Sequence, residues 1–388
     1  MEMQEAVIVD AIRTPLGKRD KGLRDVHPMD LLAGLFQEIV KRNKLDPERI
    51  DDVIGGCVMQ VGEQGGNVAR LAWLSAGLPE SVPGTSVDRQ CGSSLQAAHF
   101  AAQGIMAGVY DLAIACGVES MTRVPMGASM QNGPGMPITE SLSKRYNFAE
   151  RGFFNQGLGA EMIAREYGLN REALDRFSLE SHRRAAAAWE QGAFNNEVVP
   201  VQTPEGLVSK DEGFRADSTY EKIASLKPAF SAEGVITAGN SSQITDGASV
   251  ALIASRKTAE KLGLKPRARM ISMALAGVDP VTMLKGPIPA TQKAMAKAGL
   301  KVGDIDLFEV NEAFAPVVMA WQKDIGVPAE KTNVNGGAIA IGHPLGATGT
   351  RIIATLLNAL EQRNGRYGLI AICEGGGMAN ATIIERLG

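Results

Sequence analysis

The chain has 388 residues, of which 45% are hydrophobic and 21% charged, and its formal net charge is −3 at pH 7. This composition is typical of folded globular proteins, and the length exceeds what one hydrophobic core usually serves, so we expect two or more domains. Lys and Arg residues are scattered rather than clustered, so nucleic acid is not an expected partner. No apolar run approaches the ~20 residues needed to cross a bilayer, so a membrane-spanning protein is not expected.

The first predicted strand, residues 6–9, follows an acidic start without a basic region or an Arg-rich transit segment. We therefore expect a cytoplasmic protein. The four cysteines lie far apart and form no Cys-x-x-Cys pair, which argues against a disulfide scaffold and against a structural zinc site. They stand at positions 57, 91, 116 and 373.

Short β-rich runs alternate along the chain with amphipathic helical patterns. Strands are predicted at residues 6–9, 111–115 and 369–372. Apolar residues at helical spacing form one stripe within residues 31–39 and another within residues 352–360. This alternation predicts an α/β protein built on parallel strands.

Two distant parts of the chain resemble each other, which predicts an internal duplication. Residues 45–51 resemble residues 300–306, which lie 255 positions later. Residues 110–116 resemble residues 367–373, which lie 257 positions later, and both of these segments end in cysteine. The alternative is a chance similarity between generic helix–strand patterns.

The composition changes between the two similar halves. The segment after residue 120 is rich in Gly, Pro, Met and Ser and has no sustained period, as expected of a functional loop region. We predict an inserted loop domain, residues 121–245, that covers a site formed by the halves. The N-terminal half is predicted as residues 1–120 with 246–268, and the C-terminal half as residues 269–388.

Cys91 lies where small polar residues lead into a predicted helix, directly before Gly92 and Ser93. The positive end of a helix dipole lowers the pKa of a nearby thiol and favours the nucleophilic thiolate. The two small residues leave space for a substrate carbonyl. The alternative interpretation is a buried structural cysteine.

His343 stands between Gly342 and Pro344 in a glycine-rich segment. Proline disfavours a helical conformation of the residue before it, and glycines allow a close approach of the backbone to a ligand. We therefore expect a histidine displayed at the end of a loop, where it activates a thiol and then donates a hydrogen bond to a thioester oxygen. The other histidines lack this setting and are interpreted as surface or packing residues: His27, His99 and His182.

Cys373 closes a predicted strand and is followed by Glu374 and three glycines, residues 375–377. Consecutive glycines are costly in chain entropy, which suggests that backbone N–H groups there face a ligand oxyanion. The alternative is an inert turn. Cys116, the counterpart of Cys373 in the repeat, is predicted to be inert.

Asn311 directly follows the predicted strand 307–310. An asparagine at the end of a strand can position a water molecule, and it can equally cap the helix that follows. The spacing alone leaves both interpretations open.

Taken together, four segments resemble the thiolase family, and the resemblance covers essentially the whole chain. They are Gln90-Cys91-Gly92-Ser93-Ser94, Asn311-Glu312-Ala313-Phe314, Gly342-His343-Pro344-Leu345-Gly346, and Cys373 with Gly375-Gly376-Gly377. Each segment alone is weak evidence, but four in this order are specific. The resemblance implies a duplicated, five-layered α/β/α/β/α fold with an inserted loop domain.

The resemblance also implies a role for each matching residue. Cys91 resembles the nucleophile that carries the acyl group, and His343 resembles the base that activates it. Cys373 resembles the second cysteine, which moves a proton to and from the α-carbon of the acetyl group. Asn311 is expected to hold a water in one oxyanion hole with His343, while the backbone N–H groups of Cys91 and Gly375 form the other.

Coenzyme A and acyl-CoA are the expected partners, as substrates, and no permanently bound cofactor or metal is expected. Ser242 resembles a serine near the pantetheine of coenzyme A, and Phe314 resembles a residue that lines the same channel. The family resemblance implies a homodimer or a homotetramer, with tetramer contacts expected within residues 121–154.

The expected activity is that of an acetyl-CoA C-acyltransferase (3-ketoacyl-CoA thiolase) of fatty acid β-oxidation, with a ping-pong mechanism through acyl-Cys91. Asn155-Gln156-Gly157 stands where short-chain biosynthetic thiolases carry His-Met before a glycine, and Glu374 stands where many relatives have an apolar or small residue. We therefore favour a degradative enzyme over its close alternative, a biosynthetic acetoacetyl-CoA thiolase. Ketoacyl synthases generally lack the second cysteine, and a non-catalytic acyl-CoA-binding protein is expected to have lost at least one segment.

Overall fold

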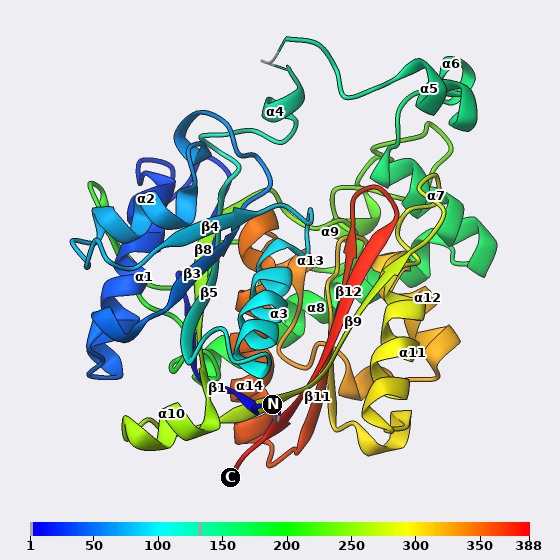
Figure 1. Cartoon of the computed structure of the whole chain (residues 1–388). Helices are drawn as coiled ribbons and strands as arrows, with labels where there is room; N and C mark the ends of the chain where they lie inside the picture. The colour runs from blue at the N-terminus through cyan, green and yellow to red at the C-terminus, as the bar shows by residue number, and fades with distance from the viewer. Residues whose placement is uncertain (1–2, 132–133) are drawn as a thin grey trace.

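The structure is a computed structural model that describes residues 3–131 and 134–388 (Figure 1). Most of its strands form two similar mixed sheets, which join edge to edge into one ten-stranded sheet, and the remaining described strands form a separate two-stranded sheet. The junction is short, because β1 (Ala6–Arg13) and β9 (Ala268–Gly277) pair at only two positions. Each half of the chain therefore has a sheet of its own.

The two sheets have the same strand pattern. The N-terminal sheet has the order β1, β8 (Thr245–Ser255), β5 (Leu112–Ser120), β3 (Asp52–Gly56) and β4 (Gly84–Val87), with β2 (Gly17–Lys18) on β8. The C-terminal sheet has the order β9, β12 (Met378–Arg386), β11 (Tyr367–Glu374) and β10 (Leu307–Val310). In both sheets the first two pairings are antiparallel and the third is parallel. A single parallel bridge between Phe308 and Thr332 stands where the N-terminal sheet has β4. The predicted duplication is confirmed.

Hydrogen bonds fix the register of the repeat. Asp51 Oδ2 accepts from the backbone N–H groups of residues 111 and 112 at 2.6 and 2.9 Å. Asp306 Oδ2 accepts in the same way from residues 366 and 367 at 2.7 and 2.9 Å. Equivalent positions are therefore 255 residues apart in the strands as well as in the preceding turns.

This register corrects one sequence-based assignment. The structural counterpart of Cys373 is Val118, and the counterpart of Cys116 is Ala371, because β3–β5 and β10–β11 pair at the same offset of 255. The sequence match had aligned two tyrosines, but Tyr110 precedes β5 by two residues whereas its match begins β11. A slip of two residues keeps the side chains on the same face of the sheet, so the strand pattern did not reveal it.

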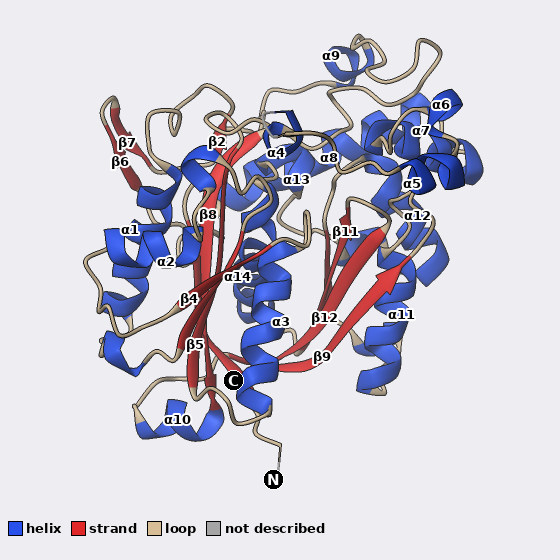
Figure 2. Ribbon diagram, turned by 45° about the horizontal axis from the view of Figure 1, so that its top comes forward, coloured by secondary structure: helices blue, strands red, loops and turns tan. Residues whose placement is uncertain are grey.

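Helices complete five layers (Figure 1). Outer helices pack on the far faces: α1 (Pro28–Arg42) and α2 (Val68–Ser75) on the N-terminal sheet, and α11 (Pro287–Ala298) and α12 (Ala315–Ile325) on the C-terminal sheet. The middle layer consists of α3 (Ser93–Met106) and α14 (Thr348–Gln362), which Figure 2 shows between the sheets. The predicted five-layered fold is confirmed.

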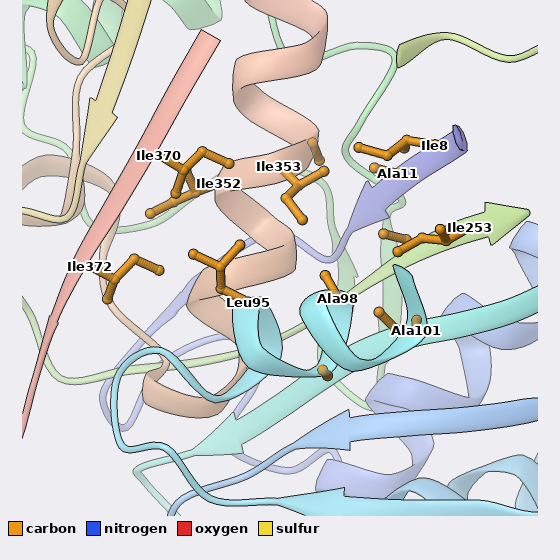
Figure 3. Close-up of a cluster of buried hydrophobic side chains, with 14 of the residues drawn as sticks. Ile8, Ala11, Leu95, Ala98, Ala101, Ile253, Ile352, Ile353, Ile370 and Ile372 are labelled. Atoms are coloured by element: carbon orange, nitrogen blue, oxygen red, sulfur yellow. The ribbon is translucent and has the colours of Figure 1, made fainter. Parts of the chain in front are cut away.

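The central core lies around the two middle helices (Figure 3). Leu95 on α3 and Ile352 on α14 are buried there against strand residues such as Ile370 and Ile372. Every residue of α14 from Thr348 to Leu360 is buried, as expected of a helix enclosed on all sides. The first turns of the two helices are in close contact, since a Cβ built on Gly349 would lie 2.0 Å from the backbone nitrogen of Leu95.

Gly349→Ala is expected to destabilise the fold, because a Cβ at this position would lie 2.0 Å from the backbone nitrogen of Leu95. Overpacking against a backbone atom costs about 1–3 kcal/mol or more. Gly34→Ala is the matched control, since this helical glycine has no atom within 4 Å of a built Cβ. Thermal unfolding of both variants checks the difference, and an unchanged melting temperature for Gly349→Ala would contradict it.

The segment between β5 and β8 holds most of the remaining elements and lies at one end of the two sheets (Figure 1). It contains α4 (Ala128–Gln131), α5 (Glu140–Tyr146), α6 (Phe148–Arg151), α7 (Gln156–Tyr167), α8 (Arg171–Glu190), β6 (Val201–Thr203), β7 (Gly206–Val208) and α9 (Tyr220–Ala224). Elsewhere lie α10 (Arg256–Lys261) and α13 (Ala338–Ile341). Among the described residues, no helix is long and apolar enough to span a membrane.

Candidate active site

Cys91 lies in a tight turn between β4 and α3. Gln90 has a left-handed backbone, with φ of +48°, which is uncommon for a residue other than glycine. The turn is held by Ser93 Oγ, which donates to Gln90 O at 2.6 Å and accepts from the N–H of Arg89 at 2.9 Å. This turn places Cys91 at the start of α3, whose N-cap residue is Gly92.

Two backbone N–H groups, that of Cys91 itself and that of Gly375, favour the Cys91 thiolate. Burial nevertheless raises the pKa of this thiol to about 12, the charge of Glu374 adds to the rise, and the two N–H groups only oppose it. The predicted lowering of the pKa is therefore wrong. The side chain is 3% exposed, and loss of solvation outweighs the effect of the helix N-terminus. The resting thiol is protonated, so a base must remove its proton.

His343 follows α13 and Gly342, and it is buried, with 3% of its surface exposed. The expectation that the loop displays it to solvent is wrong, because its loop packs between the two halves: the His343 N–H donates to Thr245 Oγ1 at 3.1 Å. Burial, and then the charge of Arg351, lower the pKa of His343 to about 3. The imidazole is neutral and able to accept a proton.

The hydrogen-bond network assigns the tautomer of His343. Thr348 Oγ1 lies 2.6 Å from His343 Nδ1 and donates its own hydrogen to Pro344 O at 2.8 Å. Since a hydroxyl has one hydrogen, Nδ1 must be the donor to Thr348. His343 Nε2 is therefore unprotonated, and Asn311 Nδ2 donates to its lone pair at 3.3 Å.

Asn311 lies directly after β10 and is 2% exposed. It is not the cap of the following helix, because α12 begins at Ala315 with Phe314 as its N-cap residue. Its Oδ1 is buried and has no hydrogen-bond partner among the described residues. Such an acceptor, beside His343 Nε2, suits an ordered water.

Cys373, 1% exposed, lies on β11 just before the glycine turn that leads to β12. Burial raises the pKa of Cys373 well above its ordinary value, and the charge of Cys91 adds to the rise, so the two thiols lie close enough to interact. Gly376 and Gly377 have φ of +80° and +77°, which favours glycine. The turn packs against the Cys91 turn, since a Cβ built on Gly375 would lie 2.9 Å from Gln90 Oε1.

The first turns of α3 and α14 bring the Cys91 and His343 segments together. The N–H of Thr350 on α14 donates to Ser94 Oγ on α3 at 3.0 Å. Leu345, two residues after His343, belongs to the same hydrophobic cluster as Cys91. Both halves of the duplicated chain therefore contribute to one site.

Ser242 and Phe314 also lie side by side. The Ser242 N–H donates to Ala313 O at 2.9 Å. Phe314 is 7% exposed, and it shares a hydrophobic cluster with Cys373. The two residues expected to contact coenzyme A are therefore neighbours, and one of them belongs to the hydrophobic cluster of the second cysteine.

The sequence did not single out two side chains that shape this site, Thr348 and Glu119. Thr348 fixes the His343 tautomer, and its position five residues after the histidine was the available signal. Glu119 is fully buried and accepts hydrogen bonds from four N–H donors: Val58 N, Met59 N, Gly346 N and Gln64 Nε2. In the part of the chain that the structure describes, no group of three or more His, Cys, Asp or Glu side chains is arranged to hold a metal ion.

Comparison with known proteins agrees with this geometry. The family model of the thiolase N-terminal domain matches residues 6–257, and that of the thiolase C-terminal domain matches residues 264–386. The chain belongs to the thiolase family. Together the two models cover almost all of this thiolase, including each of the four sequence segments that first indicated the family.

Individual relatives are similar over their whole length. The steroid 3-ketoacyl-CoA thiolase FadA6 of Mycobacterium tuberculosis is 50% identical over 389 residues, 99% of this chain and 95% of its own. A 3-ketoacyl-CoA thiolase of Citrobacter koseri is 45% identical over 99% of this chain and 100% of its own. The crystal structure of a Bacillus anthracis acetyl-CoA acetyltransferase superposes with a TM-score of 0.91, at 38% identity, over 100% of both chains. This thiolase is thus an acyltransferase, and its reaction is the thiolytic cleavage of 3-oxoacyl-CoA.

Thr348→Val is expected to lower turnover of this thiolase, because it leaves the buried Nδ1–H of His343 without an acceptor. An unpaired buried donor costs about 1–3 kcal/mol, or roughly 5- to 150-fold in rate. Thr348→Ser keeps the hydroxyl and should retain most of the turnover. Steady-state thiolysis of both variants checks this, and equal losses in the two would show that Thr348 acts through packing alone.

Proposed function

We propose that Cys91 carries the acyl group in a ping-pong reaction in which His343 is the base and Cys373 moves the α-proton. The observation that carries this proposal is the packing of the glycine turn on the Cys91 turn, where a Cβ built on Gly375 would lie 2.9 Å from Gln90 Oε1 and the N–H groups of Cys91 and Gly375 favour the Cys91 thiolate. Fixed donors of this kind stabilise an oxyanion that develops beside the sulfur. A structural cysteine has no need of them.

In the first half-reaction, the Cys91 proton moves to His343 Nε2 while the sulfur attacks the 3-oxo carbon of the substrate. The bond between C2 and C3 then breaks, leaving an acyl thioester on Cys91 and the enolate of acetyl-CoA. The Cys373 thiol protonates the α-carbon of this enolate, and acetyl-CoA leaves. The new Nε2–H of His343 and a water held by Asn311 stabilise the enolate oxygen.

In the second half-reaction, the thiol of coenzyme A gives its proton to the Cys373 thiolate and attacks the acyl thioester. Cys91 departs and recovers its proton from His343, and the shortened acyl-CoA leaves. Both thiols and the imidazole return to their starting states, so one turnover is balanced in protons. Two buried neutral thiols and a neutral imidazole suit this cycle, since each group is charged only between two steps.

We propose that Ser242 and Phe314 contact the pantetheine of coenzyme A, which is a substrate and not a resident cofactor. Support comes from their contact through Ala313 and from the shared cluster of Phe314 and Cys373, since the thioester must reach both cysteines. Phe314 also packs against Phe230, with ring centroids 5.9 Å apart. This pair gives the channel a rigid apolar wall.

The proposed acyl group is larger than acetoacetyl. A cavity of about 460 Å³ is lined mainly by residues of the segment between β5 and β8. Most of its lining is aromatic or aliphatic: Tyr146, Phe148, Phe153, Phe154, Leu158, Met162 and Val281. Phe154 also packs against the cluster that contains Cys373. A cavity of this size suits a long or polycyclic apolar acyl chain.

The test is thiolysis of acetoacetyl-CoA, of a medium-chain and a long-chain 3-oxoacyl-CoA, and of a polycyclic one. We expect kcat/KM to rise with acyl size by about tenfold or more, since each buried CH₂ contributes about 0.8 kcal/mol. Phe154→Ala should reduce that preference, whereas acetoacetyl-CoA should lose little. If the unmutated enzyme has its highest kcat/KM with acetoacetyl-CoA, the short-chain alternative replaces this proposal.

We also propose a cytoplasmic homodimer or homotetramer of this chain. Support comes from large apolar side chains exposed within residues 121–154: Met126 at 55%, Met136 at 58% and Phe153 at 39%. An interface that covers them would remove apolar surface from water. Size-exclusion chromatography with light scattering measures the assembly, and a monomer at micromolar concentration would contradict the proposal.

A further inference from the structure

The carboxyl group of Glu374 lies beside the proposed nucleophile and has no part in the mechanism above. Glu374 is the last residue of β11 and is fully buried. A Cβ built on Gly92 would lie 2.1 Å from Glu374 Oε1, so the carboxyl packs directly against the residue after Cys91. Neither of its oxygens has a hydrogen-bond partner among the described residues.

The internal repeat supplies a direct comparison. Glu119, exactly one repeat earlier at the offset of 255, is also fully buried beside the start of a middle helix. Its four N–H donors suit an ionised carboxylate, and an unpaired ionised carboxylate in the same surroundings would be very costly. Glu374 has none of these donors, which favours the protonated carboxylic acid.

Asn380 on β12 offers the acceptor that a protonated Glu374 requires. Its Nδ2 donates to Gly92 O at 2.9 Å, which fixes the orientation of the amide. Its Oδ1 is buried, is left without a donor, and would lie 2.8 Å from the same Cβ built on Gly92. The two side chains share one face of the β11–β12 pair, so they lie within reach of each other.

We propose that Glu374 is a positioning residue that, in its protonated form, donates a hydrogen bond to Asn380 and so ties the glycine turn to the first turn of α3. The link runs from Glu374 to Asn380 and on to Gly92, and it fixes the position of the Gly375 backbone relative to the Cys91 turn. This inference rests on Cys91 being the acylated thiol. Ionisation of Glu374 removes the only O–H donor of the link and adds a negative charge beside that thiol.

Several charged or titratable groups face Glu374. Asp88 and Arg89 lie in the turn before α3, Cys91 follows them, and Cys373 precedes Glu374 on its own strand, whereas Asn380 on β12 is neutral. Burial raises the pKa of Glu374 to about 8, with Arg89 opposing the rise and Asp88 adding to it. The carboxyl group is therefore protonated below that pH and charged above it, where its charge disfavours the Cys91 thiolate.

Glu374→Gln tests the proposal, because glutamine keeps an N–H donor for Asn380 and never ionises. Alkylation of Cys91 by iodoacetamide, followed by mass spectrometry, is measured from about pH 6.5 to about pH 9.5. The ratio of variant to parent rates should rise about tenfold over this range, since one pKa unit is tenfold in thiolate fraction. The control is Glu309→Gln, because Glu309 is equally buried, with its pKa raised to about 8 by burial, but lies on β10. Its ratio should stay constant with pH.

If Cys91 is alkylated but the ratio does not change with pH, the inference about Glu374 is wrong. If Cys91 of the parent is not alkylated at all, the proposed function is wrong. Infrared difference spectra supply a second readout that needs no activity. Because Glu309 is another buried carboxyl group with a raised pKa, the readout is the difference between the parent and Glu374→Gln. That difference should show a carboxylic-acid carbonyl band at about pH 6.5 that fades at about pH 9.5, and a difference without this band would show that Glu374 is not protonated.

Discussion

Cys91→Ala is expected to reduce thiolysis by about 10⁴-fold or more, because loss of a covalent nucleophile removes the intermediate itself. Incubation of the parent with acetyl-CoA, followed by an acid quench and mass spectrometry, should place an acyl adduct on Cys91. His343→Ala should still form this adduct but about 100-fold more slowly, the range for lost general-base help. The thiol is buried and protonated at rest, so its reactivity depends on that base.

Cys116→Ala is the matched control for this experiment. Cys116 is another fully buried thiol, on β5, and its Sγ lies 3.6 Å from Ile54 O, away from the glycine turn. This variant should retain turnover and the adduct on Cys91. Thiolysis that survives in Cys91→Ala, or an adduct found only on another cysteine, would refute the proposed nucleophile.

Cys373→Ala is expected to separate the two halves of the chemistry. Acylation of Cys91 by acetyl-CoA should persist, more slowly, since coenzyme A can leave as a thiolate when Cys373 no longer supplies a proton to its sulfur. Exchange of the acetyl-CoA methyl protons with solvent deuterium should fall by about 10²- to 10⁴-fold, because no positioned base remains near that carbon. NMR follows the exchange directly, and mass spectrometry follows the acylation.

The reverse variant completes this test. Cys91→Ala should lose acyl transfer and keep measurable methyl exchange, provided that Cys373 still reaches the bound acetyl-CoA. If Cys373→Ala exchanges methyl protons as fast as the parent, the second cysteine is not the proton carrier. A loss of both activities in Cys373→Ala, with an unchanged melting temperature, would instead show that acyl transfer requires the Cys373 proton.

Much of the fold was predictable because it depends on local pattern. The duplication appeared in the turns before β3 and β10, where the same hydrogen-bonded aspartate recurs 255 residues later. The strand repeat was misaligned by two residues, because a shift of two preserves the inward and outward alternation of side chains. The hydrogen bonds of these aspartates and the pairing of β5 and β11 with their neighbours revealed the true register.

The sequence by itself determined which chemistry is present: two cysteines, a histidine before proline and an asparagine after a strand, each in a segment of fixed local geometry. The tertiary structure decided how these groups behave. Burial reverses the expected pKa shift of Cys91, Thr348 selects the His343 tautomer, and two equivalent glutamates receive opposite hydrogen-bond surroundings. Solvation and hydrogen-bond partners come from segments far apart in the chain, and no local pattern encodes which of them will meet.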